Sequence, residues 1–267
     1  MSLCKLTMIT LLGIALATHL KYEFPLGQRI PYAMSVKFKG HIPILGGQEG
    51  TVEVSLKFSA TGQAPDPNGN AQVKSEIEEL KMVFNGATLP LGVKNVQTFF
   101  PPTTISLTPE GQVLKTDAPD VTLPVQLPGL NAKRFPDISY VPIQFPVDGV
   151  EVGKTFTFKK AFGASQVEYV VSPTKIDDSG VELDVSMAQD YAAMEDDRHN
   201  PTKSDSDAAF RLSTHVTGKG TAFFDRKRGL VTTAHIAADA KTHVIEVKSK
   251  AESDRDLKTE LDLKASN

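Results

Sequence analysis

Apolar residues occupy every second position in many short stretches of this 267-residue chain. Side chains of a strand point alternately to the two faces of a sheet, so this spacing predicts strands with one buried face. Turn-forming residues separate the stretches, as in 177-DDSG-180 and 108-TPEG-111. No window of helical length carries a 3.6-residue apolar stripe. We therefore expect an all-β fold of long antiparallel hairpins, built as a curved sandwich or an open half-barrel. The alternating stretches are 32–38, 52–58, 80–84, 105–107, 156–158, 167–169 and 181–187.

The composition is that of an ordinary globular protein, with 40% hydrophobic and 23% charged residues. A chain of this length buries enough surface to fold without disulfides or metals, and its single cysteine, Cys4, lies near the N-terminus. The formal net charge of −3 disfavours nucleic acids and anionic membrane surfaces, since both select basic patches. The oligomeric state cannot be inferred from these numbers.

Residues 1–17 have the features of a secretory signal peptide. Lys5 precedes an apolar run, and Ala15 and Ala17 provide the small residues of a cleavage site. The alternative, an uncleaved membrane anchor, is disfavoured because the run is shorter than the ~20 apolar residues that cross a bilayer. Cys4 precedes the run and is therefore not placed for lipidation. We expect a protein exported to a bacterial periplasm or to the medium.

The prolines divide the chain. Residues 101–146 hold nine of the 17 prolines, and proline cannot donate to a sheet ladder, so this segment is interpreted as an extended connector or an edge. It separates an N-terminal β half, 18–100, from a C-terminal β half, 147–267. The hairpins 106–116 and 223–233 resemble each other, which suggests two similar halves. The alternative, that all long hairpins share these features, stays open.

Motifs of catalysis are missing from the sequence. The stretch 163-GASQV-167 ends on valine where a nucleophile elbow needs glycine, and there is no His-Glu-x-x-His pattern. The stretch 218-GKGT-221 lacks the first glycine of a phosphate-binding loop, since Ser213 stands in its place. We therefore predict no catalytic residue, no nucleotide and no cofactor.

Three histidines, His215, His235 and His243, are interpreted as solvent-facing. If Phe224 pairs with Leu230, His215 lies opposite Asp239 and His235 opposite Lys219, while His235 and His243 are roughly 26 Å apart along one strand. Such histidines cannot surround one ion, so no metal site is predicted.

Gly218 and Gly220 fall on the opposite, packed face of the same hairpin. The oxygen-rich stretches 66–70 and 195–207 are interpreted as a turn and a solvated loop. Ile77 stands where a calcium loop needs its bidentate glutamate.

Two stretches, 145-FPVDGVEVGKTFTF-158 and 218-GKGTAFFDRKRGLV-231, together resemble a bacterial secreted β-rich family of unknown function. The chain differs in having a phenylalanine, Phe156, where we expect a tryptophan after the Val-Gly pair. The resemblance implies an exported β protein, and it supplies no catalytic residue.

The leading functional hypothesis is a non-enzymatic protein that binds an apolar small molecule or an envelope partner on a curved β surface. Aromatic residues among the prolines of the connector are the candidate ligand-binding residues, and the alternative is that they fill the core. A second hypothesis is a hydrolase of envelope or extracellular polymers that uses carboxylates such as Asp184, Asp190 or Glu195. A third is a structural or adhesive envelope component. The candidate ligand-binding residues are Phe99, Phe100, Phe135, Tyr140 and Phe145.

Overall fold

The computed structural model describes residues 17–42, 48–89, 100–118, 135–162, 165–199 and 201–266, so the predicted signal peptide lies outside the described residues except for Ala17. Nearly all of the secondary structure is strand. The only helix of the described part is the single turn α2 (Phe135–Ile138). The strands are β1 (Arg29–His41), β2 (Glu49–Gln63), β3 (Ala71–Phe84), β4 (Ala87–Leu89), β5 (Thr103–Leu107), β6 (Val113–Asp117), β7 (Phe156–Phe162), β8 (Ser165–Ile176), β9 (Gly180–Glu195), β10 (Pro201–Thr202), β11 (Phe210–Asp225), β12 (Leu230–Glu246) and β13 (Glu252–Ala265).

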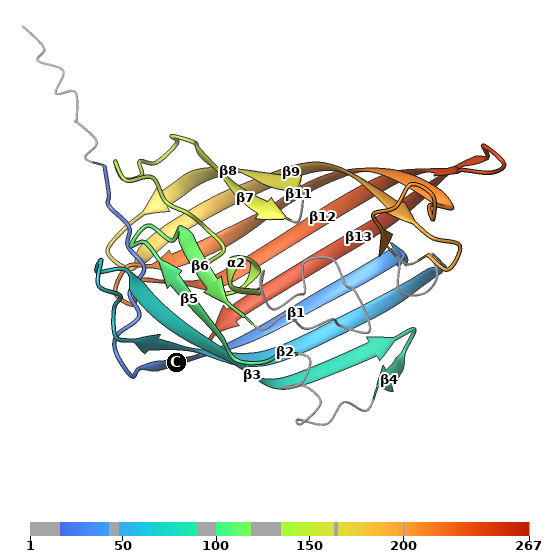
Figure 1. Ribbon diagram of the computed structural model, residues 1–267. Coiled ribbons are helices and arrows are strands. Elements are labelled where there is room, and N and C mark those ends of the chain that lie inside the picture. Colours follow the sequence, from blue (N-terminus) through green and yellow to red (C-terminus); the bar gives the residue numbers. More distant parts are fainter. Residues whose placement is uncertain are drawn as a thin grey trace, which may run out of the picture.

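Within the described residues, thirteen strands form one sheet in the order β6-β5-β3-β2-β1-β13-β12-β11-β9-β8-β7, with β4 beside β3 and β10 beside β9. Neighbouring strands run antiparallel, and the first strand, β1, pairs with the last, β13, in the middle of the sheet. The sheet is open and strongly curved, and α2 lies on its inner side (Figure 1). The predicted all-β, antiparallel, open fold is confirmed.

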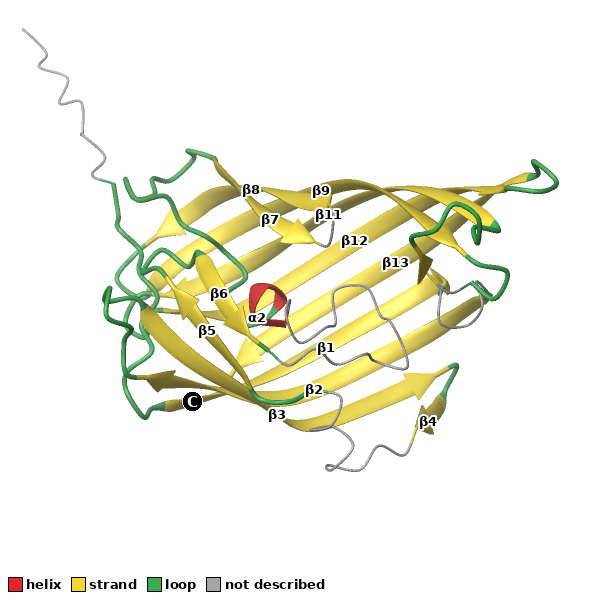
Figure 2. Cartoon of the chain, in the orientation of Figure 1, coloured by secondary structure: helices red, strands yellow, loops and turns green. Residues whose placement is uncertain are grey.

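The alternation seen in the sequence gives the sheet two chemically different faces. On β1, Tyr32, Met34, Val36 and Phe38 are buried, while the residues between them are exposed. We call the side of these buried residues the inner face and the other side the outer face. Figure 2 shows loops at both ends of the strands and α2 on the inner side of the sheet.

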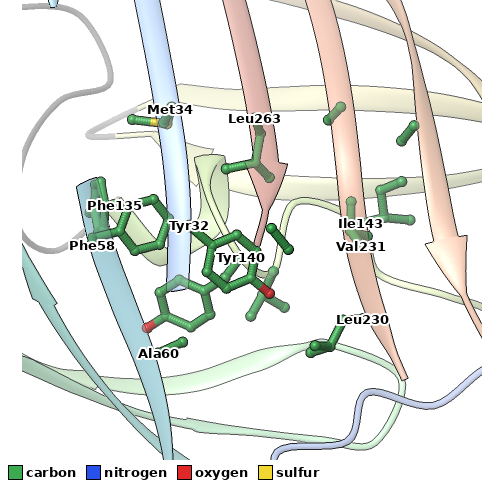
Figure 3. Close-up of a cluster of buried hydrophobic side chains, with 14 of the residues drawn as sticks. Tyr32, Met34, Phe58, Ala60, Phe135, Tyr140, Ile143, Leu230, Val231 and Leu263 are labelled. Carbon is green, nitrogen blue, oxygen red and sulfur yellow. The ribbon is translucent and has the colours of Figure 1, made fainter. Parts of the chain in front are cut away.

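The connector contributes an edge hairpin and part of the core. Its strands β5 and β6 lie at one end of the sheet. Its last part packs under the sheet, where Phe135, Tyr140 and Ile143 join Tyr32 and other residues in one buried cluster (Figure 3). The two ends of the sheet are thereby linked through a common core.

The predicted register of the β11–β12 hairpin is wrong by two residues. His215 lies opposite Lys241, not Asp239, and His235 lies opposite Thr221, not Lys219. One residue of the error arises at the turn, where Phe224 pairs with Val231 and not with Leu230. The other arises at an irregularity between Phe223 and Phe224, where the pairing shifts by one residue. A shift by an even number keeps every side chain on its face, so His215 and His235 are exposed on the outer face as predicted.

Candidate functional site

Beyond the packed core, the inner face carries apolar side chains that stay half-exposed. They come from four neighbouring strands, β9, β11, β12 and β13. We call this set the open inner face. Its members are Met187, Leu212, Val216, Ile236, Ala238, Ala240, Leu257 and Leu261.

The strand register arranges these residues in rows across the sheet. In each row at least one of the two middle strands, β11 and β12, carries a glycine or an alanine. A glycine at position 220 is required by the approach of β12, because a Cβ there would overlap the carbonyl oxygen of His235. The rows are Val185–Gly220–Ile236–Leu261, Met187–Gly218–Ala238–Thr259 and Gln189–Val216–Ala240–Leu257.

The next row, toward the end of the sheet that is distant from the core, is polar. It contains Thr214 and Thr242, whose hydroxyl oxygens are 2.9 Å apart, followed by Arg255 on β13. The Arg255 guanidinium donates a long hydrogen bond of 3.4 Å to the buried carboxylate of Glu195. The same carboxylate oxygen lies 3.0 Å from Nδ1 of His199. This end of the open inner face is therefore polar, with its buried carboxylate paired.

An aromatic ring supports that ion pair. The imidazole of His199 stacks on Phe210 with ring centroids 4.6 Å apart, and the guanidinium of Arg255 lies 5.9 Å from the centre of the same ring. Contacts of this kind hold charged groups in place where water is partly excluded. Glu195, predicted to belong to a solvated loop, is thus a buried residue at the end of β9.

Gln189 is the residue of this surface that the sequence did not point to. It lies on β9 with its side chain on the inner face and is only 7% exposed. Its Nε2 atom has no hydrogen-bond partner among the described residues. Alternation identifies inner positions by their apolar residues, and Gln189 is polar. The pattern therefore does not identify Gln189 as an inner residue.

The predicted ligand-binding aromatics lie in and against the core. Phe99 is outside the described residues, and Phe100 packs half-buried against the core. Phe135, Tyr140 and Phe145 are 4%, 0% and 3% exposed. Phe135 meets Phe58 edge to face at 4.8 Å, and Phe145 meets Phe224 in the same way at 4.9 Å. Their role in ligand binding stays a prediction.

Burial changes the ionisation of the tyrosines in this region. Loss of hydration raises the pKa of Tyr140 well above its usual range, and the nearby Tyr32 and Asp137 act in the same direction. Burial likewise raises the pKa of Tyr32, and it raises the pKa of Tyr169 to about 12. These phenols therefore stay protonated at neutral pH.

The carboxylates named for a hydrolase do not converge. Asp184 and Asp190 point outward from β9, six residues and roughly 20 Å apart. Glu195 points to the inner face. Glycosidases of the common kind need two carboxyl groups about 5 to 9 Å apart across one substrate.

The outer-face histidines are each paired with one aspartate across neighbouring strands. Nδ1 of His215 is 2.7 Å from Asp190, and Nδ1 of His235 is 2.8 Å from Asp262. Within the described ranges no group of three or more histidine, cysteine or acidic side chains could hold a metal ion.

A shallow hollow of about 560 Å³ opens on the outer face above β1, β2, β12 and β13. Two ion pairs line it, Lys57–Glu79 at 2.6 Å and His235–Asp262 at 2.8 Å. Small exposed side chains, Ala33, Ser35 and Ser55, complete much of the lining. Because the hollow is shallow, it would leave much of a bound molecule in water, so it is the weaker candidate for an apolar ligand.

No family model matches this chain, and no curated protein sequence matches it. A solved structure described as "Lipid-protein interactions in lipovitellin" is similar, with 12% sequence identity and a TM-score of 0.48. The likeness covers 92% of this chain and 26% of that one, so the chain spans about a quarter of its length. At this level of similarity the function has to be argued from the chain's own residues. Within the described residues, no helix is both long and apolar enough to cross a membrane.

Proposed function

We propose that this protein binds an apolar small molecule on the open inner face of its curved sheet, as a non-enzymatic exported protein. The observation that carries the proposal is a contiguous apolar surface that stays half-exposed directly beside the core, from Met187 on β9 to Leu261 on β13. Proteins rarely leave such a surface without a use, because each apolar area kept in water weakens the fold. Curved sheets commonly hold ligands on this side.

The outer face supports the same choice by contrast. Its exposed side chains form cross-strand ion pairs, such as Lys37–Glu53 at 3.3 Å and Lys159–Glu168 at 3.3 Å. Charged side chains of both signs keep this face hydrated and discourage association with apolar partners. The inner face therefore provides the apolar surface for a ligand.

Export is part of the proposal through residues 1–17 and through the resemblance to a secreted bacterial family. An exported protein with an apolar binding surface suits the transport or storage of a molecule that water does not dissolve. The absence of convergence among Asp184, Asp190 and Glu195 argues against the hydrolase hypothesis as it was framed on those residues.

The test is to fill the open inner face with one added ring. Ala238 is half-exposed on the inner face, and its neighbour Ala237 is exposed on the outer face of the same strand. Ala238→Phe should weaken uptake of the fluorescent probe N-phenyl-1-naphthylamine by about tenfold or more. Ala237→Phe, the matched control, should bind the probe like the parent protein.

Two results would overturn the proposal. One is the absence of saturable probe uptake by the parent protein. The other is equal loss of uptake in both alanine variants, since only Ala238 lies on the proposed surface. Thermal melting of each variant shows whether its fold is retained.

A further inference from the structure

Gln189 is a buried hydrogen-bond donor on an otherwise apolar surface. It lies in one row with Val216, Ala240 and Leu257. Its Nε2 is one of three buried side-chain atoms that have no partner within the described residues, and the other two are the hydroxyls of Tyr32 and Tyr140. Both tyrosines lie in the packed aromatic core (Figure 3), whereas Gln189 adjoins the open inner face.

Stability of the fold does not account for a glutamine at this position. Burying an amide without a partner costs free energy that a leucine of similar volume would avoid. Its neighbours Val185 and Met187 on the same face of β9 are apolar. A ligand that brings a hydrogen-bond acceptor to Nε2 would remove the cost.

The surroundings of Gln189 define the rest of the ligand. Val216, Ala240 and Leu257 are apolar and half-exposed, so most of the molecule lying on this row must be hydrocarbon. The hydroxyls of Thr214 and Thr242, one row further along, are 2.9 Å from each other and form a pair. The acceptor that reaches Gln189 is then an isolated oxygen on an apolar molecule.

The charges at this end of the open inner face favour an uncharged molecule. Arg255 lies in the row of Thr242, and its guanidinium is paired with the buried carboxylate of Glu195 at 3.4 Å. An anionic head group beside Arg255 would be repelled by the carboxylate of Glu195. It would also find the guanidinium of Arg255 already neutralised by that carboxylate. A desolvated charge without a partner is strongly unfavourable.

We infer that the ligand of the open inner face is an uncharged lipid with an ester or similar carbonyl group, and that Gln189 Nε2 donates a hydrogen bond to this carbonyl oxygen. The inference rests on the proposed function and specifies its ligand class. Gln189 thereby discriminates acyl esters from plain hydrocarbons, while the paired charges of Arg255 and Glu195 disfavour fatty acids in their anionic form.

The experiment compares three ligands of equal chain length, methyl palmitate, palmitate and hexadecane, as competitors of N-phenyl-1-naphthylamine on the full-length protein. The ester should displace the probe at a concentration about tenfold lower than the hydrocarbon or the acid. Gln189→Leu should bind ester and hydrocarbon equally while melting at an unchanged or higher temperature. Gln166→Leu, an exposed glutamine on the adjacent strand β8, is the matched control and should keep the preference.

Infrared spectroscopy gives a second readout on the parent protein alone. Methyl palmitate labelled with ¹³C at its carbonyl should show a band shifted to lower frequency when bound, and Gln189→Leu should abolish the shift. Equal affinity of the parent for ester and hydrocarbon, or tightest binding of palmitate, would overturn this inference and leave the proposed function standing. Failure of every competitor and of the probe to bind would overturn the proposed function itself.

Discussion

The hydroxyl of Tyr22 donates a hydrogen bond of 2.9 Å to the carbonyl oxygen of Ile143, across 121 residues of sequence. Tyr22 precedes the first strand, and Ile143 belongs to the Pro-rich connector. The ring of Tyr22 also meets Phe224 of β11 edge to face at 5.5 Å. One side chain thus joins the N-terminal segment, the connector and the C-terminal part of the sheet.

Replacing the hydroxyl of Tyr22 should be more harmful than replacing that of Tyr32. Tyr22→Phe leaves the buried carbonyl of Ile143 without its donor and should lower the free energy of unfolding by about 0.5 to 1.5 kcal/mol. Tyr32→Phe removes a hydroxyl without a partner in the described part of the chain and should leave stability unchanged or raise it. Urea denaturation measures both, and an equal loss in the two variants would contradict the assignment.

Phe135 should behave as a core residue. It is 4% exposed and lies edge to face with Phe58, so Phe135→Ala should destabilise the protein by about 3 to 5 kcal/mol. Phe100→Ala, at a half-buried position against the same core, should cost less. A Phe135→Ala variant that melts like the parent but loses probe uptake would instead make the connector a ligand-binding element.

Gly220 should tolerate a methyl group less well than Gly218. A Cβ at Gly220 would meet the backbone oxygen of His235, whereas at Gly218 it would meet the flexible side chain of Met187 at 2.7 Å. Gly220→Ala should therefore destabilise the hairpin by about 1 to 3 kcal/mol, and Gly218→Ala by less. The melting temperatures of the two variants measure this difference. A larger decrease for Gly218→Ala than for Gly220→Ala would show that the strands separate easily at position 220.

His235→Ala provides the corresponding surface control. The side chain is exposed and paired with Asp262 at 2.8 Å, an interaction of little net value in water. Its loss should change stability by no more than about 0.5 kcal/mol. Zinc-dependent melting that disappears in this variant would contradict the assignment of His235 to a solvated face.

Alkaline pH should unfold the protein through its buried phenols. Burial raises the pKa of Tyr22, Tyr32, Tyr140 and Tyr169 above the usual 10.0. Below pH 10 these groups are protonated in both states, and their contribution to stability is fully present. Above it the unfolded chain ionises first, so stability falls as pH rises. Tyrosinate absorbance should therefore increase together with unfolding, and tyrosines that titrate with the fold intact would contradict the burial.

Cleavage of the signal peptide after Ala17 should preserve the first contact of the described chain. Thr18 and Val150 exchange two backbone hydrogen bonds of 2.8 Å, and an α-amino group at Thr18 can still donate to Val150. N-terminal sequencing of protein isolated from its host should begin at Thr18. A sequence that begins at Met1 would contradict export by this route.

Period-two alternation was sufficient to predict the class of the fold and most of its strands, because the inner face is buried along much of each strand. It did not single out β13, where the inner positions alternate between polar and apolar residues, as in Arg255, Leu257 and Thr259. It also misplaced the β11–β12 register by two residues, because neither the pairing of Phe224 with Val231 at the turn nor the irregularity beside Phe223 leaves a signature in a single sequence.

The candidate site was harder to predict than the fold. The connector aromatics were predicted to bind a ligand because they are large apolar groups. In the structure Phe135, Tyr140 and Phe145 pack into the core. The surface that stays half-exposed combines larger side chains such as Ile236 with small ones such as Ala238 and Ala240, and its exposure depends on what lies across from it. The sequence of one strand does not reveal the exposure of its inner side chains, because this exposure depends on packing between distant segments.

The position of β13 between β12 and β1 also constrains the order of assembly. The second edge of β1 (residues 29–41) pairs with β13 (residues 252–265). The two parts of the sheet therefore cannot join until this last strand has been synthesised. Until then β1 presents an unpaired apolar edge, the kind of surface through which nascent chains aggregate. Contacts this distant in sequence make for slow folding. A chaperone that shields the edge of β1 would therefore assist the protein before its final strand is in place.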